Sequence, residues 1–127
     1  MNTSQVYIQK LNTHSETLFT ANNMLDGTGP MTEIFVAGPN GSRVDKILVK
    51  ALAATSSGLI NIFVFDGNVA RLVTQAVVEP MLPSLMATTF ETVISTTNIF
   101  TLPSGWSLMA SITKNEYFSI TAFGGDF

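Results

Sequence analysis

The stretch that decides the fold of this chain is residues 43–78, RVDKILVKALAATSSGLINIFVFDGNVARLVTQAVV. Two short polar breaks interrupt its β-forming residues, TSSG at 55–58 and DGN at 66–68. Asp-Gly and Gly-Asn both suit the positive φ angles of a tight hairpin, so residues 59–65 are predicted to pair antiparallel with residues 69–77. With the strand that precedes the first break, the stretch predicts a three-stranded meander.

Alternation within these strands predicts which side chains are buried. The predicted inward-facing residues are Ile47, Val49 and Ala51 on the first strand and Ile60, Ile62 and Val64 on the second. The opposite faces carry Lys46, Lys50 and Asn61 and are predicted to be polar. A sheet with one apolar face needs a second layer to cover it. Nothing in this stretch resembles a catalytic site.

The rest of the chain predicts further strands joined by short turns. Strands are expected at residues 16–21, 31–37 and 87–95, with a break at 96–98, and in a closing hairpin that starts at Trp106. Glycine and proline mark the turns between them. About eight strands without a helix of three turns predict an all-β antiparallel sandwich or jelly roll. We expect an N-terminal arm at residues 1–14 and a single β-sandwich domain at residues 15–127.

The composition limits the classes of partner. Charged residues form only 12% of the chain, against about 25% in typical soluble domains. Ser, Thr, Asn and Gly replace them, which gives a neutral surface suited to contact with copies of the chain or with a larger body. An ordinary domain with a Thr-rich exposed face is the alternative. The net charge is −3 and the basic residues are scattered, so no nucleic acid partner is expected.

Several other features are missing from the sequence. The chain contains no cysteine, which excludes disulfides and Cys-ligated zinc. Its first residues lack the basic segment and apolar run of a secretory signal, and no stretch approaches the roughly 18 apolar residues of a membrane helix. We therefore expect a soluble product made in a cytoplasm, with no membrane partner.

Residue types needed for catalysis are sparse. His14 is the only histidine, so a Ser-His-Asp triad or a His-rich metal site is not expected. Asp26 begins a D-G-T-G run, which we interpret as a turn because a calcium loop needs further acidic ligands. Glu79, Glu91 and Glu116 fall on separate predicted elements. The sequence therefore predicts no enzyme, no cofactor, no metal and no small-molecule substrate.

Two apolar segments are candidates for partner contact. One follows residue 78, where two prolines exclude a central strand and the apolar side chains have no strand periodicity to bury them. Such a loop either docks onto another chain or folds back to cap the open end of the sandwich. The other segment is the predicted arm. The candidate contact residues are Val6, Tyr7, Ile8 and Leu11 in the arm, and Met81, Leu82, Leu85 and Met86 in the loop.

Three stretches resemble a family of small structural proteins of tailed bacteriophages. They are DGTG at 26–29, GSRVDKI at 41–47 followed by VKA at 49–51, and LPSGWSL at 102–108 through FSITAFGGDF at 118–127. The family pattern has an RI-x-x-I-x-V-K-A strand, a central strand ending in DG, and an LPAGWSL-x-A-S … GGD ending. This chain departs from it by conservative changes such as Ser104 and Met109, and the resemblance spans roughly residues 20–127.

The resemblance implies a virion component made in the host cytoplasm. It points to a capsid decoration or cement protein of β-sandwich type on the outside of the head, a homotrimer with the major capsid protein as its partner. A binding module is the competing function, in which loops at one end of the sandwich recognise a host-surface carbohydrate or receptor, as in a tail or fibre component. For sugar contact Tyr117 with Asn115 is a better candidate than Trp106, whose strand position predicts core packing.

Overall fold

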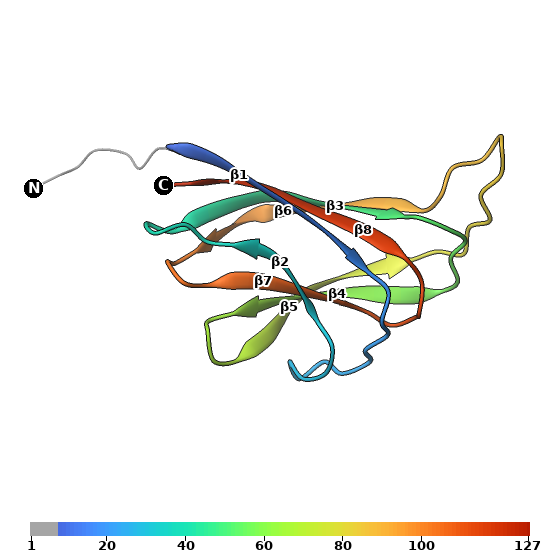
Figure 1. Cartoon of the computed structure of the whole chain (residues 1–127), viewed down its shortest axis with the longest axis horizontal. Coiled ribbons are helices and arrows are strands. Elements are labelled where there is room, and N and C mark those ends of the chain that lie inside the picture. Colours follow the sequence, from blue (N-terminus) through green and yellow to red (C-terminus); the bar gives the residue numbers. More distant parts are fainter. Residues whose placement is uncertain (1–7) are drawn as a thin grey trace, which may run out of the picture.

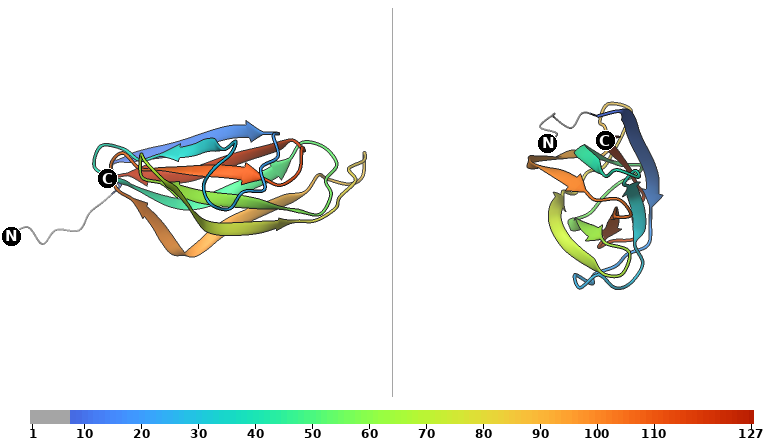
Figure 2. Two further views of the ribbon diagram at one scale, coloured as in Figure 1. Left: turned by 90° about the horizontal axis from the view of Figure 1, so that it is seen from below. Right: turned by 90° about the vertical axis from the view of Figure 1, so that its left-hand side faces the viewer.

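The computed structural model describes residues 8–127, apart from the side chains of residues 95–100. The strands are β1 (Lys10–Leu18), β2 (Thr32–Val36), β3 (Ser42–Ala51), β4 (Gly58–Phe65), β5 (Ala70–Val78), β6 (Glu91–Leu102), β7 (Ser107–Ile112) and β8 (Phe118–Asp126). They form two four-stranded sheets, ordered β1-β8-β3-β6 and β2-β7-β4-β5 (Figure 1, Figure 2). Neighbouring strands are antiparallel throughout. The predicted all-β sandwich is confirmed.

The order of the strands identifies the sandwich as a jelly roll. Four of the pairs are β1 with β8, β2 with β7, β3 with β6, and β4 with β5. These are the pairs of one long hairpin that has been folded over to make two sheets of four strands. The two halves of the chain therefore meet along their whole length. The β4–β5 turn lies at the closed end of that long hairpin.

The predicted hairpin of residues 59–77 is confirmed, whereas the predicted meander and the predicted closing hairpin are wrong. β7 pairs with β2 and β4, and β8 pairs with β1 and β3 in the other sheet, so the last two strands do not pair with each other. β4 pairs with β5 from Gly58 opposite Val78 to Phe65 opposite Ala70. β3, however, lies in the other sheet, where it pairs with β6 and β8. The residues between β3 and β4 carry the chain across the sandwich instead of reversing it within one sheet. A small, polar, glycine-bearing break has the same composition in a hairpin and in a crossover, so the sequence does not distinguish them.

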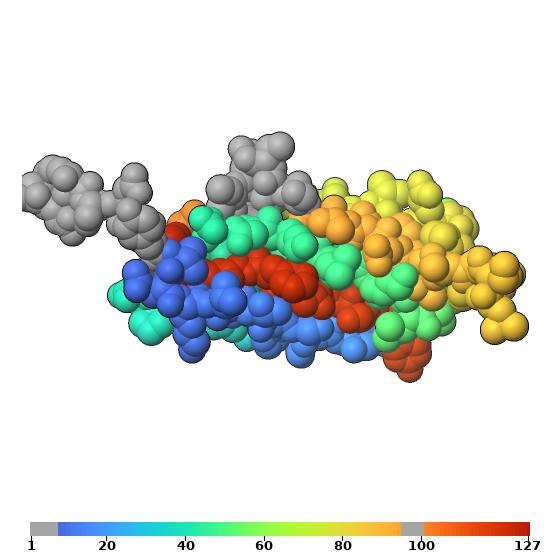
Figure 3. All heavy atoms as spheres, turned by 90° about the horizontal axis from the view of Figure 1, so that it is seen from above, coloured from blue at the N-terminus to red at the C-terminus, as the bar shows by residue number. Residues whose placement is uncertain are grey.

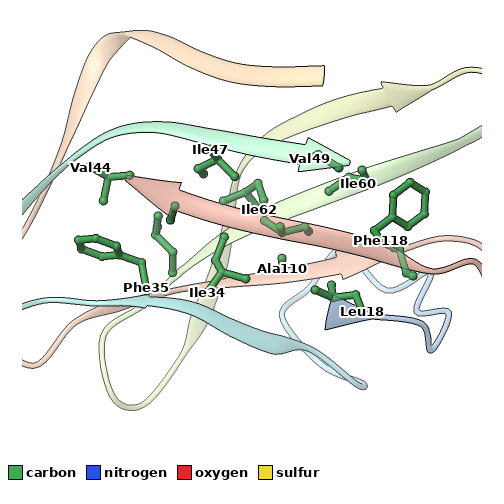
Figure 4. Close-up of a cluster of buried hydrophobic side chains, with 14 of the residues drawn as sticks. Leu18, Ile34, Phe35, Val44, Ile47, Val49, Ile60, Ile62, Ala110 and Phe118 are labelled. Atoms are coloured by element: carbon green, nitrogen blue, oxygen red, sulfur yellow. The ribbon is translucent and has the colours of Figure 1, made fainter. Parts of the chain in front are cut away.

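Side chains from both sheets fill the space between the layers (Figure 4). The predicted inward residues are buried in this core: Ile47, Val49 and Ala51 on β3, and Ile60 and Ile62 on β4. Val64 and Trp106 lie partly buried against it. Phe35 from one sheet and Phe118 from the other are fully buried. Burying a side chain of this size stabilises the fold by about 1.5–3 kcal/mol. The two sheets are therefore held together, and the strands fix the positions at which the loops begin and end.

The outer face of β4 is buried, which corrects the prediction that it is polar and exposed. Asn61 is 0% exposed, and Phe63 on the same face is buried as well. The cover is the loop of residues 19–31, which pairs with the end of β7 at Ala21 and then reaches Ala70 at the start of β5. β4 lies between β7 and β5, so the loop has to cross it. Gly27 makes the crossing possible, because a Cβ there would lie 2.1 Å from the Ala70 carbonyl oxygen.

Two strand boundaries also differ from the prediction. β1 begins at Lys10 and ends at Leu18, so residues 10–14 belong to a strand and not to an arm. An edge strand with mostly polar side chains shows little apolar alternation, and only Leu18 in β1 is buried. β6 continues through the predicted break at residues 96–98, where its register with β3 shifts. Residues 1–7 of the predicted arm lie outside the described residues.

Candidate partner-contact surfaces

The loop between β5 and β6, residues 79–90, carries the most exposed apolar side chains that the structure describes. Leu82 is 82% exposed, and Leu85 and Met86 are almost fully exposed. Met81, in contrast, is partly buried against the core. The sequence leaves two roles open for this loop, capping the sandwich and docking onto another chain. Met81 packs on the core, as in the first role, whereas Leu82, Leu85 and Met86 face outward, as the second requires. Figure 3 shows the loop projecting from one end of the molecule.

Hydrogen bonds hold this loop in shape. Thr55 and Met81 exchange backbone hydrogen bonds of 3.0 and 3.3 Å, and Thr55 Oγ1 donates to the Glu79 carbonyl oxygen at 2.8 Å. At the tip, Ser84 and Ala87 exchange backbone bonds of 3.0 and 3.3 Å. Ser84 Oγ also accepts from the Met86 backbone N–H at 3.1 Å. A loop ordered before it docks loses less conformational freedom on binding.

Further apolar side chains are exposed at the same end of the sandwich. Leu52 follows β3, and its backbone N–H donates to the Tyr117 carbonyl oxygen at 2.9 Å. Val77 lies one residue from the end of β5. Leu52, Val77 and Tyr117 are each at least half exposed. Together with Leu82, Leu85 and Met86 they form what we call the apolar end. Several exposed apolar side chains at one end of a soluble protein are a feature of contact sites.

Ile8 and Leu11, the arm candidates that the structure describes, lie at the opposite end, where β1 begins and β8 ends (Figure 1). Ile8 packs on Gly125, where a Cβ would lie 2.4 Å from Ile8 Cγ2. Leu11, opposite Gly125 in β8, is largely exposed. The structure therefore does not bring Ile8 and Leu11 together with the β5–β6 loop. Val6 and Tyr7 lie outside the described residues.

The ionisable residues singled out in the sequence are dispersed. His14 Nε2 lies 3.5 Å from Glu16 Oε2, with both side chains partly exposed. Asp26 Oδ1 accepts hydrogen bonds from Thr28 Oγ1 and Thr28 N–H, at 2.6 and 3.1 Å, and these bonds lower the pKa of Asp26. This is the geometry of a side-chain-capped turn. Within residues 8–127, no three or more His, Asp or Glu side chains gather in a way that could hold a metal ion. The described residues also include no helix long and apolar enough to cross a membrane.

Asn115 and Tyr117, the candidate sugar contacts, are both used to hold the loop of residues 19–31. Asn115 Oδ1 accepts from the Ala21 backbone N–H at 2.7 Å. The Tyr117 ring stacks on Phe19, with 4.2 Å between ring centroids. Sequence reasoning did not single out Phe19, which lines a neighbouring pocket of about 270 Å³ together with residues of β1, β2 and β7. No local motif could have indicated this pocket, because its walls come from segments far apart in the chain.

The GGD ending has a structural role. Asp126 Oδ1 accepts from Ser42 Oγ at 2.5 Å and from Asn12 Nδ2 at 2.8 Å. These hydrogen bonds lower the pKa of the Asp126 carboxyl group. Asn12 Nδ2 also donates to the Val36 carbonyl oxygen at 2.9 Å. The last residues of β8 thus join three strands at one end of the sandwich.

No protein-family model and no curated protein matches this chain. The fold itself is shared by viral capsid domains and lectins, so it does not choose between a shell role and a binding role.

Proposed function

We propose that this chain is a bacteriophage virion structural protein, a capsid decoration or cement protein that binds the outside of the head and stabilises capsomer contacts. The observation that carries the proposal is the apolar end: Leu82, Leu85 and Met86 face outward on a hydrogen-bonded loop. The low charge of the chain and the resemblance of residues 20–127 to small phage structural proteins support it. The partner is the major capsid protein, and no enzymatic activity is involved.

The positions of the two candidate surfaces suit a bridging role. The apolar end and the Ile8–Leu11 region lie at opposite ends of the sandwich (Figure 1). One copy could therefore contact two neighbouring capsomers. Each large apolar side chain that becomes buried contributes about 1.5–3 kcal/mol. Because a head carries many copies, a modest interface in each adds up to a substantial barrier against opening of the shell.

Homotrimer formation is part of the proposal. β5 and β6 are edge strands, and an edge strand offers unpaired backbone groups to a strand from another chain. The few charges on the surface also reduce repulsion between copies. Sedimentation of the purified chain over a range of concentrations would report the number of copies.

The direct test is to mix the purified chain with undecorated phage heads and to image the washed particles by cryo-electron microscopy. The expected result is symmetric density at capsomer junctions, with the apolar end against the capsid. A double variant, Leu85→Ser with Met86→Ser, is expected to abolish decoration. The matched control, Met24→Ser with Leu25→Ser, removes two exposed apolar side chains from the loop of residues 19–31 and should decorate normally. Bare heads with the unmodified chain would reject the proposal.

A second candidate function is a tail- or fibre-associated module that binds a host-surface carbohydrate or receptor. The observation that favours it is the pocket beside Phe19. Two results together would favour this function: the chain binds purified tails or host cells, and it leaves the heads undecorated in the experiment above.

A further inference from the structure

The pocket beside Phe19 opens between the end of β1 and the start of β2, with β7 as its floor. Thr17, Thr20, Thr32 and Ser111, all with hydroxyl side chains, are among its lining residues. None of the lining residues that the structure describes has an ionisable side chain. A charged ligand would lose its hydration in this pocket without gaining an ionic partner. The lining therefore suits an uncharged ligand that carries several hydroxyl groups.

The floor of the pocket contains a buried polar row. Ser111 is 1% exposed and Asn61 is 0% exposed. Gln75 Nε2 donates to Asn61 Oδ1 at 2.8 Å, whereas Asn61 Nδ2 lies 3.5 Å from Ser111 Oγ. The second distance is at the upper limit for a hydrogen bond. Ser111 is thus almost completely buried and faces Asn61, so the hydroxyl groups that a ligand can reach are those of the threonines in the lining.

The wall formed by the loop of residues 19–31 is held in place by Asn22. This buried side chain donates from Nδ2 to the Thr28 and Pro30 carbonyl oxygens, at 2.9 and 2.8 Å, and accepts at Oδ1 from the Met24 N–H at 2.9 Å. Its backbone N–H donates to the Ile112 carbonyl oxygen at 2.7 Å. The pocket is thus preformed, so a ligand does not have to order its walls.

Phe19 is the aromatic residue among those that line the pocket. The ring is partly exposed and is fixed by its stack on Tyr117. Aromatic faces carry partial negative charge and attract the slightly positive C–H groups of a sugar ring. A fixed ring next to several hydroxyl groups offers contacts for both the C–H groups and the hydroxyl groups of a sugar.

We propose that this pocket binds one unit of an uncharged sugar, such as the terminal hexose of a glycan. Its volume is just below the roughly 300–1,000 Å³ of pockets that hold drug-sized molecules, which fits a single ring. The site does not depend on whether the chain is attached to a head or to a tail. Failure to decorate heads and failure to bind sugar are therefore separate results.

The test is an NMR titration of the ¹⁵N-labelled chain with methyl α-D-glucopyranoside, methyl α-D-galactopyranoside and N-acetylglucosamine, with glucuronate as the charged comparison. At least one neutral sugar is expected to bind with a Kd on the order of millimolar and to shift the amide signals of residues 17–20, 31–32 and 110–111. Glucuronate is expected to bind more weakly. No saturable shift with any neutral sugar, or shifts confined to other residues, would overturn the proposal.

Two variants remove single hydroxyl groups from the pocket. Thr32→Val and Thr20→Val should each weaken binding about two- to tenfold, the loss expected for one hydrogen bond. Thr13→Val is the matched control, because Thr13 is exposed on β1 and does not line the pocket. Thr20 is exposed, so its substitution leaves the fold intact. Unchanged affinity in Thr32→Val would reject the assigned site.

Discussion

Ser42 Oγ donates a 2.5 Å hydrogen bond to Asp126 Oδ1, which joins the first residue of β3 to the last residue of β8. The same hydroxyl oxygen accepts from the Gly38 backbone N–H at 2.8 Å. Asn12 Nδ2 donates to the same carboxylate oxygen from β1. One carboxylate therefore joins β8 to β1 and to β3, through residues that lie 114 and 84 positions away from it in the sequence.

Replacing Asp126 should destabilise this end of the sandwich. Asp126→Ala removes two hydrogen bonds to a charged acceptor and leaves the buried Ser42 hydroxyl without that acceptor, so we expect a loss of about 1–3 kcal/mol in the free energy of unfolding. Asp126→Asn can retain an acceptor oxygen and should lose less. Asp45→Ala, which breaks an exposed pair with Arg43, is the control and should have little effect. Urea unfolding measures all three. Equal stability of Asp126→Ala and the unmodified chain would contradict this role.

The same carboxylate makes stability depend on pH. Its hydrogen bonds with Ser42 and Asn12 lower the pKa of Asp126 below the ordinary value of 3.8. The unfolded chain therefore binds a proton more readily than the folded chain. The stabilisation is fully present above pH 3.8 and is lost as the pH falls through the lower pKa of the folded state. Asp26 and Asp66, whose pKa values are also lowered by hydrogen bonds, act in the same direction.

We expect the free energy of unfolding to be nearly constant from about pH 7 to pH 5 and to fall below about pH 4. Urea unfolding across this range measures it. Asp126→Asn, which cannot ionise, should show a shallower decline than the unmodified chain. Identical pH profiles for the two would show that Asp126 does not contribute.

Gly27 and Gly67 give a matched test of the loop that covers β4. Both have positive φ, +88° and +97°, so alanine is strained at either position. At Gly67 nothing lies within 4 Å of an added Cβ, whereas at Gly27 the Cβ would meet the Ala70 carbonyl oxygen at 2.1 Å. Gly67→Ala should cost about 1–2 kcal/mol, and Gly27→Ala should cost clearly more and expose Phe63. Thermal unfolding and ANS binding report these effects. Equal losses would show that the loop can move away from β5 freely.

The parts of the fold that the sequence predicts well are those set by neighbouring residues. The Asp66-Gly67-Asn68 break indicates the β4–β5 hairpin because its backbone chemistry is local. Alternation along β3 and β4 indicates the core face for the same reason. The crossover at residues 52–57 is different, because which sheet receives the next strand depends on distant strands.

The same reasoning explains the errors at Asn61 and in the contact surfaces. Asn61 has the residue type of an exposed position, and its burial comes from a loop some forty residues earlier in the chain. In the β5–β6 loop the sequence indicates apolar residues without periodicity, but only the backbone pair between Met81 and Thr55 decides that Met81 turns inward. The pocket beside Phe19 depends in the same way on contacts between distant segments.

Asn22→Asp should destabilise the loop of residues 19–31. The Asn22 amide nitrogen donates hydrogen bonds to the Thr28 and Pro30 carbonyl oxygens, and a carboxylate oxygen in its place cannot donate. Loss of these bonds and burial of a charge next to two acceptors should cost about 2–4 kcal/mol at neutral pH. Asn23→Asp makes the same chemical change at the exposed neighbouring position and should be nearly neutral. Urea unfolding compares the two variants. If both lose the same stability, the side chain of Asn22 does not organise the loop.

Met81 and Met86 differ in burial although they lie in one loop, and the same substitution should separate their roles. Met81→Ser removes a partly buried side chain from the core and should lower the free energy of unfolding by about 1–2 kcal/mol. Met86→Ser changes a side chain that faces solvent and should stay within about 0.5 kcal/mol of the unmodified chain. Urea unfolding gives both values. When undecorated heads are added, Met81→Ser should bind them like the unmodified chain. Met86→Ser should bind them more weakly, because only Met86 lies on the apolar end. A large loss of stability in Met86→Ser would instead mean that this part of the loop also caps the core.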